Sequence, residues 1–211
     1  MTTIIIFGVS EKSGLLFLHH ALAKGYRVKA FVSKITILEN IIHPNLQIIQ
    51  GDIFDQTSLL RGMKNIDTVV CCLKNNNKEK RNISIAIEKI LLGMKELKIR
   101  RMIYLSSINI TGSEHSKSFI HRFLNMFYVS ENLEDNLKQE IMIKNSELEW
   151  IIIKPPQISE NVSHGNYEIK DSGLITKEAF ITRSDLIDCM IELLNNPTYI
   201  KKVISIINKQ I

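Results

Sequence analysis

The first 32 residues constrain the fold more than any other part of the chain. Residues 3–7 (TIIIF) form a short apolar run, which is typical of a buried strand, and the run ends at Gly8. A helical pattern, LLFLHHALAKG, follows from Leu15 and ends at Gly25, and residues 27–32 give a second strand. A strand, a helix and a strand within about 30 residues indicate a βαβ unit.

The turn between the first strand and the helix, residues 8–14 (GVSEKSG), predicts a phosphate site. Gly8 allows the tight turn, Gly14 lets the helix pack close to the sheet, and the unpaired amides at the helix start can bind phosphate. Glu11 stands where a middle glycine would let a pyrophosphate approach the backbone. On these residues alone, an ordinary strand-to-helix turn is an equally good interpretation.

The rest of the chain continues the same alternation of apolar strands and helices. We predict strands at 46–52, 67–73, 102–105, 150–154 and 203–207, and helices at 58–63, 83–97, 131–144 and after the capping-box sequence TRSD that ends at Asp185. Continuous apolar strands separated by helices indicate a parallel sheet that is covered on both faces. We therefore predict one α/β domain over residues 1–211, a doubly wound Rossmann-type sheet with strand order 3-2-1-4-5-6 and an added strand.

The cysteine content and the absence of targeting patterns indicate the compartment of the protein. The three cysteines, Cys71, Cys72 and Cys189, form no CxxC pair and have no histidine at metal spacing, so we expect reduced thiols and no metal. The sequence shows neither a signal-peptide pattern nor an apolar run close to the ~20 residues of a membrane span. We expect a cytoplasmic protein without a membrane partner.

The net charge of +5 raises the question of an anionic partner. Two basic stretches, residues 74–81 and 115–122, could contact nucleic acid, but neither is interleaved with the aromatics of a recognised module. A solvated loop near a phosphate-bearing cofactor explains them at least as well, so we expect no nucleic-acid partner. The irregular segment 106–130 carries aromatics at 119, 123 and 127, and long loops of this kind usually shape binding pockets.

Several stretches, taken in order, resemble the atypical short-chain dehydrogenase/reductase family that binds NAD(P)H, and within it the biliverdin-IX-beta and flavin reductases look most similar. They are IIIFGVSEKSG at the start, GD at 51–52, YLSS at 104–107, SELEWIIIKPPQI at 146–158, GNYEI at 165–169 and ITRSDLIDCM at 181–190. The resemblance covers nearly the whole chain and implies an NAD(P)H-dependent reductase.

The resemblance also implies where the cofactor lies. The implied binding residues are Gly8, Ser10, Glu11, Lys12, Ser13 and Gly14 for the pyrophosphate, Ser33 and Lys34 for the ribose, Asp52 and Ile53 for the adenine, Leu73 and Lys74 beside the cofactor, and Pro155, Pro156 and Gln157 near the nicotinamide. The family often has an arginine just after the second strand. Because no acidic residue stands at that point here, recognition of a free ribose hydroxyl is disfavoured and NADP is the expected cofactor.

The chain departs from the wider superfamily at the proton donor. Asn132 and Asn136 match the positions of the usual tyrosine and lysine, and Gln157 replaces the family histidine after the two prolines. Ser107 remains as the predicted catalytic residue, a hydrogen-bond donor to the nicotinamide, although a serine that satisfies backbone groups at a strand end is the alternative. The biliverdin and flavin reductases also lack the tyrosine–lysine pair, so the departure is compatible with hydride transfer.

Three functions follow as hypotheses. The first is a monomeric reductase that passes a hydride from NADPH to a small planar conjugated acceptor, a flavin or a linear tetrapyrrole such as biliverdin. The second is a non-catalytic NADP(H)-sensing regulator that resembles the NmrA-like proteins. In the third, Glu11 abolishes dinucleotide binding and only the fold survives.

We predict that NADPH binds more tightly than NADH and that Lys34→Glu weakens NADPH selectively. A charge-assisted hydrogen bond from Lys34 to the 2′-phosphate is worth roughly 1.5–3 kcal/mol, and NADH offers no such phosphate. Titration of both nucleotides into the wild type and the variant at moderate salt measures the difference. Equal wild-type affinities for the two nucleotides would contradict the assignment.

Overall fold

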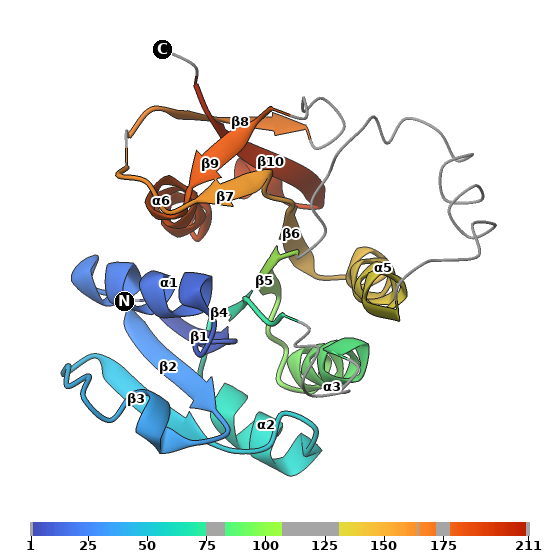
Figure 1. Cartoon of the computed structure of the whole chain (residues 1–211). Helices are drawn as coiled ribbons and strands as arrows, with labels where there is room; N and C mark the ends of the chain where they lie inside the picture. The colour runs from blue at the N-terminus through green and yellow to red at the C-terminus, as the bar shows by residue number, and fades with distance from the viewer. Residues whose placement is uncertain (1, 75–82, 107–130, 164, 172–177, 210–211) are drawn as a thin grey trace.

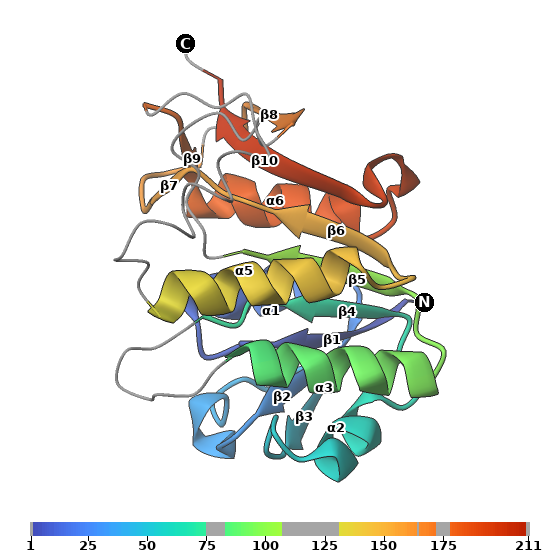
Figure 2. The same ribbon diagram turned by 90° about the vertical axis from the view of Figure 1, so that its right-hand side faces the viewer.

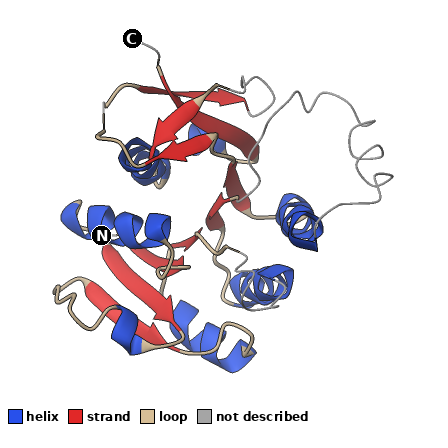
Figure 3. Ribbon diagram, viewed as in Figure 1, coloured by secondary structure: helices blue, strands red, loops and turns tan. Residues whose placement is uncertain are grey.

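One sheet of eight strands carries the fold, in the order β3-β2-β1-β4-β5-β6-β10-β8 (Figures 1 and 3). The computed structural model describes residues 2–74, 83–106, 131–163, 165–171 and 178–209. The strands of this sheet are β1 (Thr3–Phe7), β2 (Arg27–Val32), β3 (Leu46–Gln50), β4 (Thr68–Cys71), β5 (Arg101–Leu105), β6 (Glu149–Ile153), β8 (Tyr167–Asp171) and β10 (Lys202–Asn208). All neighbours pair in parallel except β10 and β8, which are antiparallel.

Helices cover both faces of the sheet (Figures 1 and 2). They are α1 (Lys12–Ala23) and α6 (Arg183–Leu193) on one face, and α2 (Gln56–Met63), α3 (Ile83–Glu96) and α5 (Glu131–Lys144) on the other. Side chains alternate between the two faces along each strand, so Ile4 and Ile6 of β1 join the core under α1 and α6. Ile5 and Phe7 join the opposite core. This two-sided burial explains why the strands read as continuous apolar runs.

The doubly wound α/β fold and its strand order 3-2-1-4-5-6 with an added strand are confirmed. The added strand is β10, as predicted, but the sheet continues to β8, and a separate pair forms from β7 (Gln157–Ser159) and β9 (Phe180–Thr182). These three strands are short or half-buried and have no apolar run, so only pairing with distant partners makes them strands. The short helix predicted at 58–63 begins two residues earlier, after the cap at Asp55.

Two glycines fix how α1 joins the sheet. Gly8 adopts a φ of +87°, and a Cβ atom there would lie 2.5 Å from the carbonyl carbon of Cys72. A Cβ atom on Gly14 would lie 2.1 Å from the carbonyl oxygen of Gly8. The backbone of the turn is therefore in direct contact with the end of β4 and with the first turn of α1, and neither position has room for a side chain.

The predicted start of α6 at the sequence TRSD is confirmed, but the capping box is not closed, because the Thr182 amide donates to Asn208 Oδ1 at 2.7 Å instead of to Asp185. Thr182 is the N-cap and accepts a hydrogen bond from the amide of Asp185 at 3.1 Å. Asp185 is fully buried and accepts from Ser163 Oγ at 2.6 Å and from the amide of Gly165 at 3.0 Å. Asp185 thus fastens the chain segment that precedes β8 to the start of α6.

The two basic stretches and the aromatic positions at 119, 123 and 127 lie outside the described residues, apart from Lys74. None of the helices in the described ranges is long and apolar enough to cross a membrane.

We predict that Gly14→Ala lowers the free energy of unfolding by about 1–3 kcal/mol, because the new methyl group overlaps the Gly8 carbonyl. Gly93→Ala is the matched control inside another helix, α3. Its Cβ would meet two side chains, that of Met63 at 3.2 Å from the sulfur and that of Gln56 at 3.6 Å from Nε2, so the change should stay within about 1 kcal/mol. Urea unfolding of both variants measures the contrast, and equal stabilities would contradict the tight packing.

Candidate functional site

The predicted site residues gather along one edge of the sheet, where the parallel strands end. Residues 8–14 follow β1, 33–34 follow β2, 52–53 follow β3, 73–74 follow β4, and 155–157 follow β6. Ligands of open α/β sheets bind in the crevice outside the carboxyl ends of the strands, at the point where the strand order reverses. Here that point lies between β1 and β4. Ser107 lies outside the described residues.

The turn before α1 presents backbone donors. Ser10 is exposed, and Glu11 is the N-cap of α1 but its side chain makes no capping hydrogen bond. The amides of the first helical turn have no partner within a helix and carry the positive end of its dipole. Lys12, Ser13 and Gly14 lie in that turn, so their amides can bind an anion.

Glu11 lies near the end of β4. The pKa of the Cys72 thiol is raised, mainly by burial and further by the charges of Cys71 and Glu11. Cys72 directly follows β4 and its amide donates to Phe7 at 2.8 Å. The Glu11 charge therefore contributes to the electrostatics at the end of β4.

A charged cluster that sequence reasoning missed lies over the start of α1. Arg183, the first residue of α6, donates from Nη1 to Ser13 Oγ at 2.6 Å. Its Nη2 and Nε donate to the two carboxylate oxygens of Glu160, at 2.7 and 3.1 Å. Lys12 Nζ contacts the same carboxylate at 3.2 Å. Helices α1 and α6 pack side by side, which places two cations and two helix amino ends together (Figure 1).

Glu160 remains ionised throughout the neutral range. Hydrogen bonds from Arg183 and then from Lys12 lower the pKa of its carboxyl to about 2. Its side chain is 58% exposed, whereas that of Arg183 is 18% exposed. Glu160 lies between β7 and the segment that Asp185 holds, and this connection brings the carboxylate to Arg183. The sequence carries no local signal of the contact, because Glu160 and Arg183 are 23 residues apart.

The predicted adenine and ribose end is built from loop residues. The amide of Gly51 donates to Val32 at 3.0 Å, and Asp52 accepts from the amide of Phe54 at 2.9 Å, so the ends of β2 and β3 are joined. Ser33 and Lys34 are exposed just after β2. The Lys34 amine makes no ion pair with any residue in the described ranges, so it is available to a ligand phosphate.

Pro155 and Pro156 are buried at the predicted nicotinamide end, and Gln157 after them is exposed. Directly before them, Lys154 forms a buried ion pair with Glu140 of α5, at 3.0 Å, with side chains that are 2% and 3% exposed. Ser106 Oγ donates to Glu140 at 2.8 Å. Sequence reasoning missed this pair, because a lysine after an apolar strand is ordinarily a surface residue.

Asn136, the position matched to the superfamily lysine, is buried in a polar cluster on the same helix. Its side-chain oxygen lies 3.3 Å from Gln139 Nε2, which also donates to Asp135 at 2.7 Å. Gln139 in turn accepts from the Tyr104 hydroxyl at 2.6 Å, and burial is the main reason that the pKa of Tyr104 is raised well above its ordinary value. The amide of Asn136 offers no proton that titrates near neutrality.

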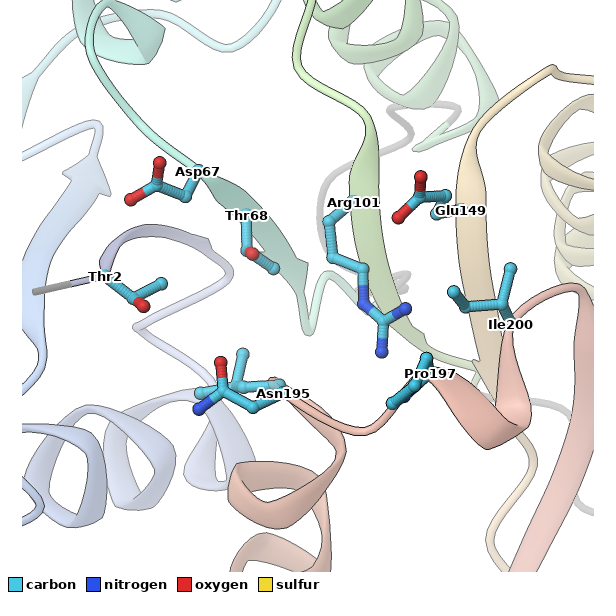
Figure 4. Close-up of a pocket in the computed structure, with 9 residues that line it drawn as sticks. Thr2, Asp67, Thr68, Arg101, Glu149, Asn195, Pro197 and Ile200 are labelled. Atoms are coloured by element: carbon cyan, nitrogen blue, oxygen red, sulfur yellow. The ribbon is translucent and has the colours of Figure 1, made fainter.

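A hollow of about 570 Å³ lies at the opposite edge of the sheet, where the strands begin (Figure 4). It contains none of the predicted site residues. Its central cation, Arg101, donates through Nη2 to the carbonyls of Leu193 and Asn196 at 2.8 and 2.7 Å. Arg101 therefore caps the carboxyl end of α6. We assign the hollow no part in the chemistry. No group of three histidine, cysteine or acidic residues in the described ranges is arranged to hold a metal.

Solved structures share this fold at low sequence identity. A Rossmann-fold NAD(P)-binding family protein from Shigella flexneri has a TM-score of 0.79 and 18% identity, over 99% of this chain and 94% of that one. A Veillonella parvula short-chain dehydrogenase/reductase in complex with NADP has a TM-score of 0.76 and 13% identity, over 97% and 94%. ChuY, an anaerobillin reductase from Escherichia coli, has a TM-score of 0.78 and 19% identity, over 100% and 98%. No curated protein matches the chain.

The family of the chain follows from its sequence. Identities below 20% establish the fold alone, but a family model described as NAD(P)H-binding matches residues 8–197. That range starts at the glycine of the first turn and extends past Arg183 and the rest of α6. It covers most of the chain and all the strand ends where the predicted site lies, and the protein therefore belongs to the NAD(P)H-binding family.

Proposed function

We propose that this protein is an NADPH-dependent reductase that passes a hydride to a planar conjugated acceptor, a flavin or a linear tetrapyrrole. The observation that carries the proposal is the glycine turn at 8–14, which lies at the topological switch point of a chain in the NAD(P)H-binding family. The likeness of the whole chain to ChuY, an anaerobillin reductase, favours the tetrapyrrole class.

The residues present fit a dinucleotide. At Gly8 and Gly14 a Cβ atom would collide with backbone, so the turn packs tightly against the end of β4 and the first turn of α1, and Ser10 and Lys12 are its exposed residues. Ser13 Oγ accepts from Arg183 and keeps its own hydrogen to donate to a phosphate. Lys34 supplies a cation after β2, where the 2′-phosphate of NADP would lie.

The nicotinamide, when bound, supplies the hydride. The protein contributes position and exclusion of water. Pro155 and Pro156 form a buried wall without N–H donors at the end of β6, and the Glu140–Lys154 pair behind them holds β6 against α5. We propose that Ser107, next to the buried Ser106, donates one hydrogen bond that orients the reacting ring.

We propose that no side chain acts as a general acid. Asn136 cannot release a proton near neutrality, and Gln157 is an amide as well. Lys154 and Glu140 are buried and contact each other at 3.0 Å, so neither side chain is exposed to an acceptor. Solvent then supplies the proton that accompanies the hydride.

The runner-up function is an NADP(H)-sensing regulator without turnover. The absence of a titrating group at 132 and 136 favours it, because a sensor needs a binding site but no proton donor. Incubation of the protein with NADPH and FMN, or NADPH and biliverdin, separates the two functions. If the protein binds NADPH tightly but oxidises it with neither FMN nor biliverdin, the sensor function is assigned. For the reductase we propose a monomer whose partners are small molecules, whereas the sensor would signal through a partner surface.

We predict that Glu11→Gly tightens NADPH and NADH alike, roughly threefold to tenfold. A like charge close to the pyrophosphate costs on the order of 1 kcal/mol, and a glycine also allows closer approach to the backbone. Glu11→Gln removes the charge and keeps the side chain, so calorimetric titration of both variants separates the two contributions. Unchanged affinity in both would mean that the carboxylate does not face the phosphates.

We predict a flat pH profile for flavin reduction across the neutral range, because the residues assigned to the site include no histidine or cysteine. Ser107→Ala should slow turnover by the value of one hydrogen bond, about 0.5–1.5 kcal/mol, and leave measurable activity. Steady-state kinetics from about pH 6 to 9 test both statements. A bell-shaped kcat profile, or a fully inactive Ser107→Ala that still binds NADPH, would contradict the mechanism.

A further inference from the structure

Arg183 uses every nitrogen of its guanidinium in the cluster over α1. Two nitrogens hold the Glu160 carboxylate as a fork, at 2.7 and 3.1 Å, and the third donates to Ser13 at 2.6 Å. A planar guanidinium fork suits carboxylate and phosphate oxygens equally well. The carboxylate of Glu160 therefore occupies a place that has the chemistry of a phosphate site.

The position of the Glu160 carboxylate also lies within the proposed cofactor site. Ser13 and Lys12 are in the first turn of α1, whose amides can bind an anion. Both residues touch the cluster, Ser13 through Arg183 and Lys12 through Glu160. A pyrophosphate over residues 8–14 would come within reach of both cations. Arg183 and Glu160 cannot keep their present bonds if Arg183 also binds that pyrophosphate.

We propose that Arg183 and Lys12 form a phosphate clamp and that Glu160 is an internal counter-anion which the cofactor displaces. This inference rests on the proposed binding of NADPH at the turn. Displacement is feasible because the Glu160 side chain is more than half exposed and can turn to solvent. Arg183 stays in place without it, because its bond to Ser13 is independent of Glu160. Glu160 thus competes with the dinucleotide for Arg183 and Lys12 and lowers its affinity. An anion that carries more negative charge than one carboxylate, such as a pyrophosphate, displaces it more readily.

The test is calorimetric titration of NADPH and NADH into the wild type and Glu160→Gln. The clamp acts on the pyrophosphate that both nucleotides share, so we expect Kd to fall by the same factor for both, about threefold to tenfold. Adenosine 2′-monophosphate, which lacks the pyrophosphate and is measured by competition with NADPH, should bind equally to both proteins. Glu147→Gln is the matched control, because it removes one exposed carboxylate at the opposite edge of the sheet.

A second variant, at Arg183, tests whether Glu160 changes the nucleotide affinity through Arg183. Arg183→Gln should raise Kd about tenfold or more for both nucleotides, because a charge-assisted contact to the phosphate is lost. In the double variant, Glu160→Gln should no longer tighten binding as it does alone, since its effect runs largely through Arg183. This non-additivity distinguishes a clamp from a general change of surface charge.

The outcomes separate this inference from the proposed function. If the wild type binds NADPH but Glu160→Gln leaves Kd unchanged or raises it, the counter-anion role is wrong and the cofactor site stands. If Glu160→Gln tightens NADPH and Glu147→Gln does so equally, the effect is one of net charge and the clamp is wrong. If neither the wild type nor Glu160→Gln binds either nucleotide, the proposed function falls, and this inference falls with it.

Discussion

The contact between the first turn and the end of β4 is the constraint on which the rest of the structure depends. Without a side chain at Gly8 the backbone can lie against Cys72, and without one at Gly14 the helix can lie against Gly8. These approaches aim the amino end of α1 at the switch point between β1 and β4. A dinucleotide site on this fold requires that direction, because the helix amides are its anion donors.

The second helix of the same face completes the site. Because α6 packs parallel to α1, Arg183 reaches Ser13 at one end of the pair, and Asp188 meets His20 at 2.8 Å further along. Asp185 ties the preceding segment to the start of α6 through Ser163 and Gly165. One buried carboxylate thereby places a distant loop, including Glu160, over the start of α1. The packing of α6 on α1 and the bonds of Asp185 therefore determine which charged side chains lie at the site.

On the opposite face of the sheet, a buried ion pair joins the elements. Lys154 and Glu140 are both almost fully buried, and such charges are tolerated only when they are paired and hydrogen-bonded. Ser106 completes the pairing at the end of β5. Lys144 also lies 3.5 Å from Glu140, so this cluster joins β5, β6 and α5 to one another. The two prolines that follow Lys154 are held in place by that framework.

The sequence by itself determined the sheet order and the strand ends at which the site residues lie, because apolar runs and glycine turns are local signals of a parallel sheet. It also determined the absence of an acidic residue after β2. Only the tertiary structure decided the edge strand β8, the pair of β7 and β9, the buried Lys154–Glu140 pair, and the contact of Arg183 with Ser13 and Glu160. Each of these joins residues far apart in the chain, and nothing in the local pattern of either partner specifies the other. The charge at the phosphate site, and with it the affinity for a cofactor, depends on packing between α1 and α6 that no single stretch of sequence encodes.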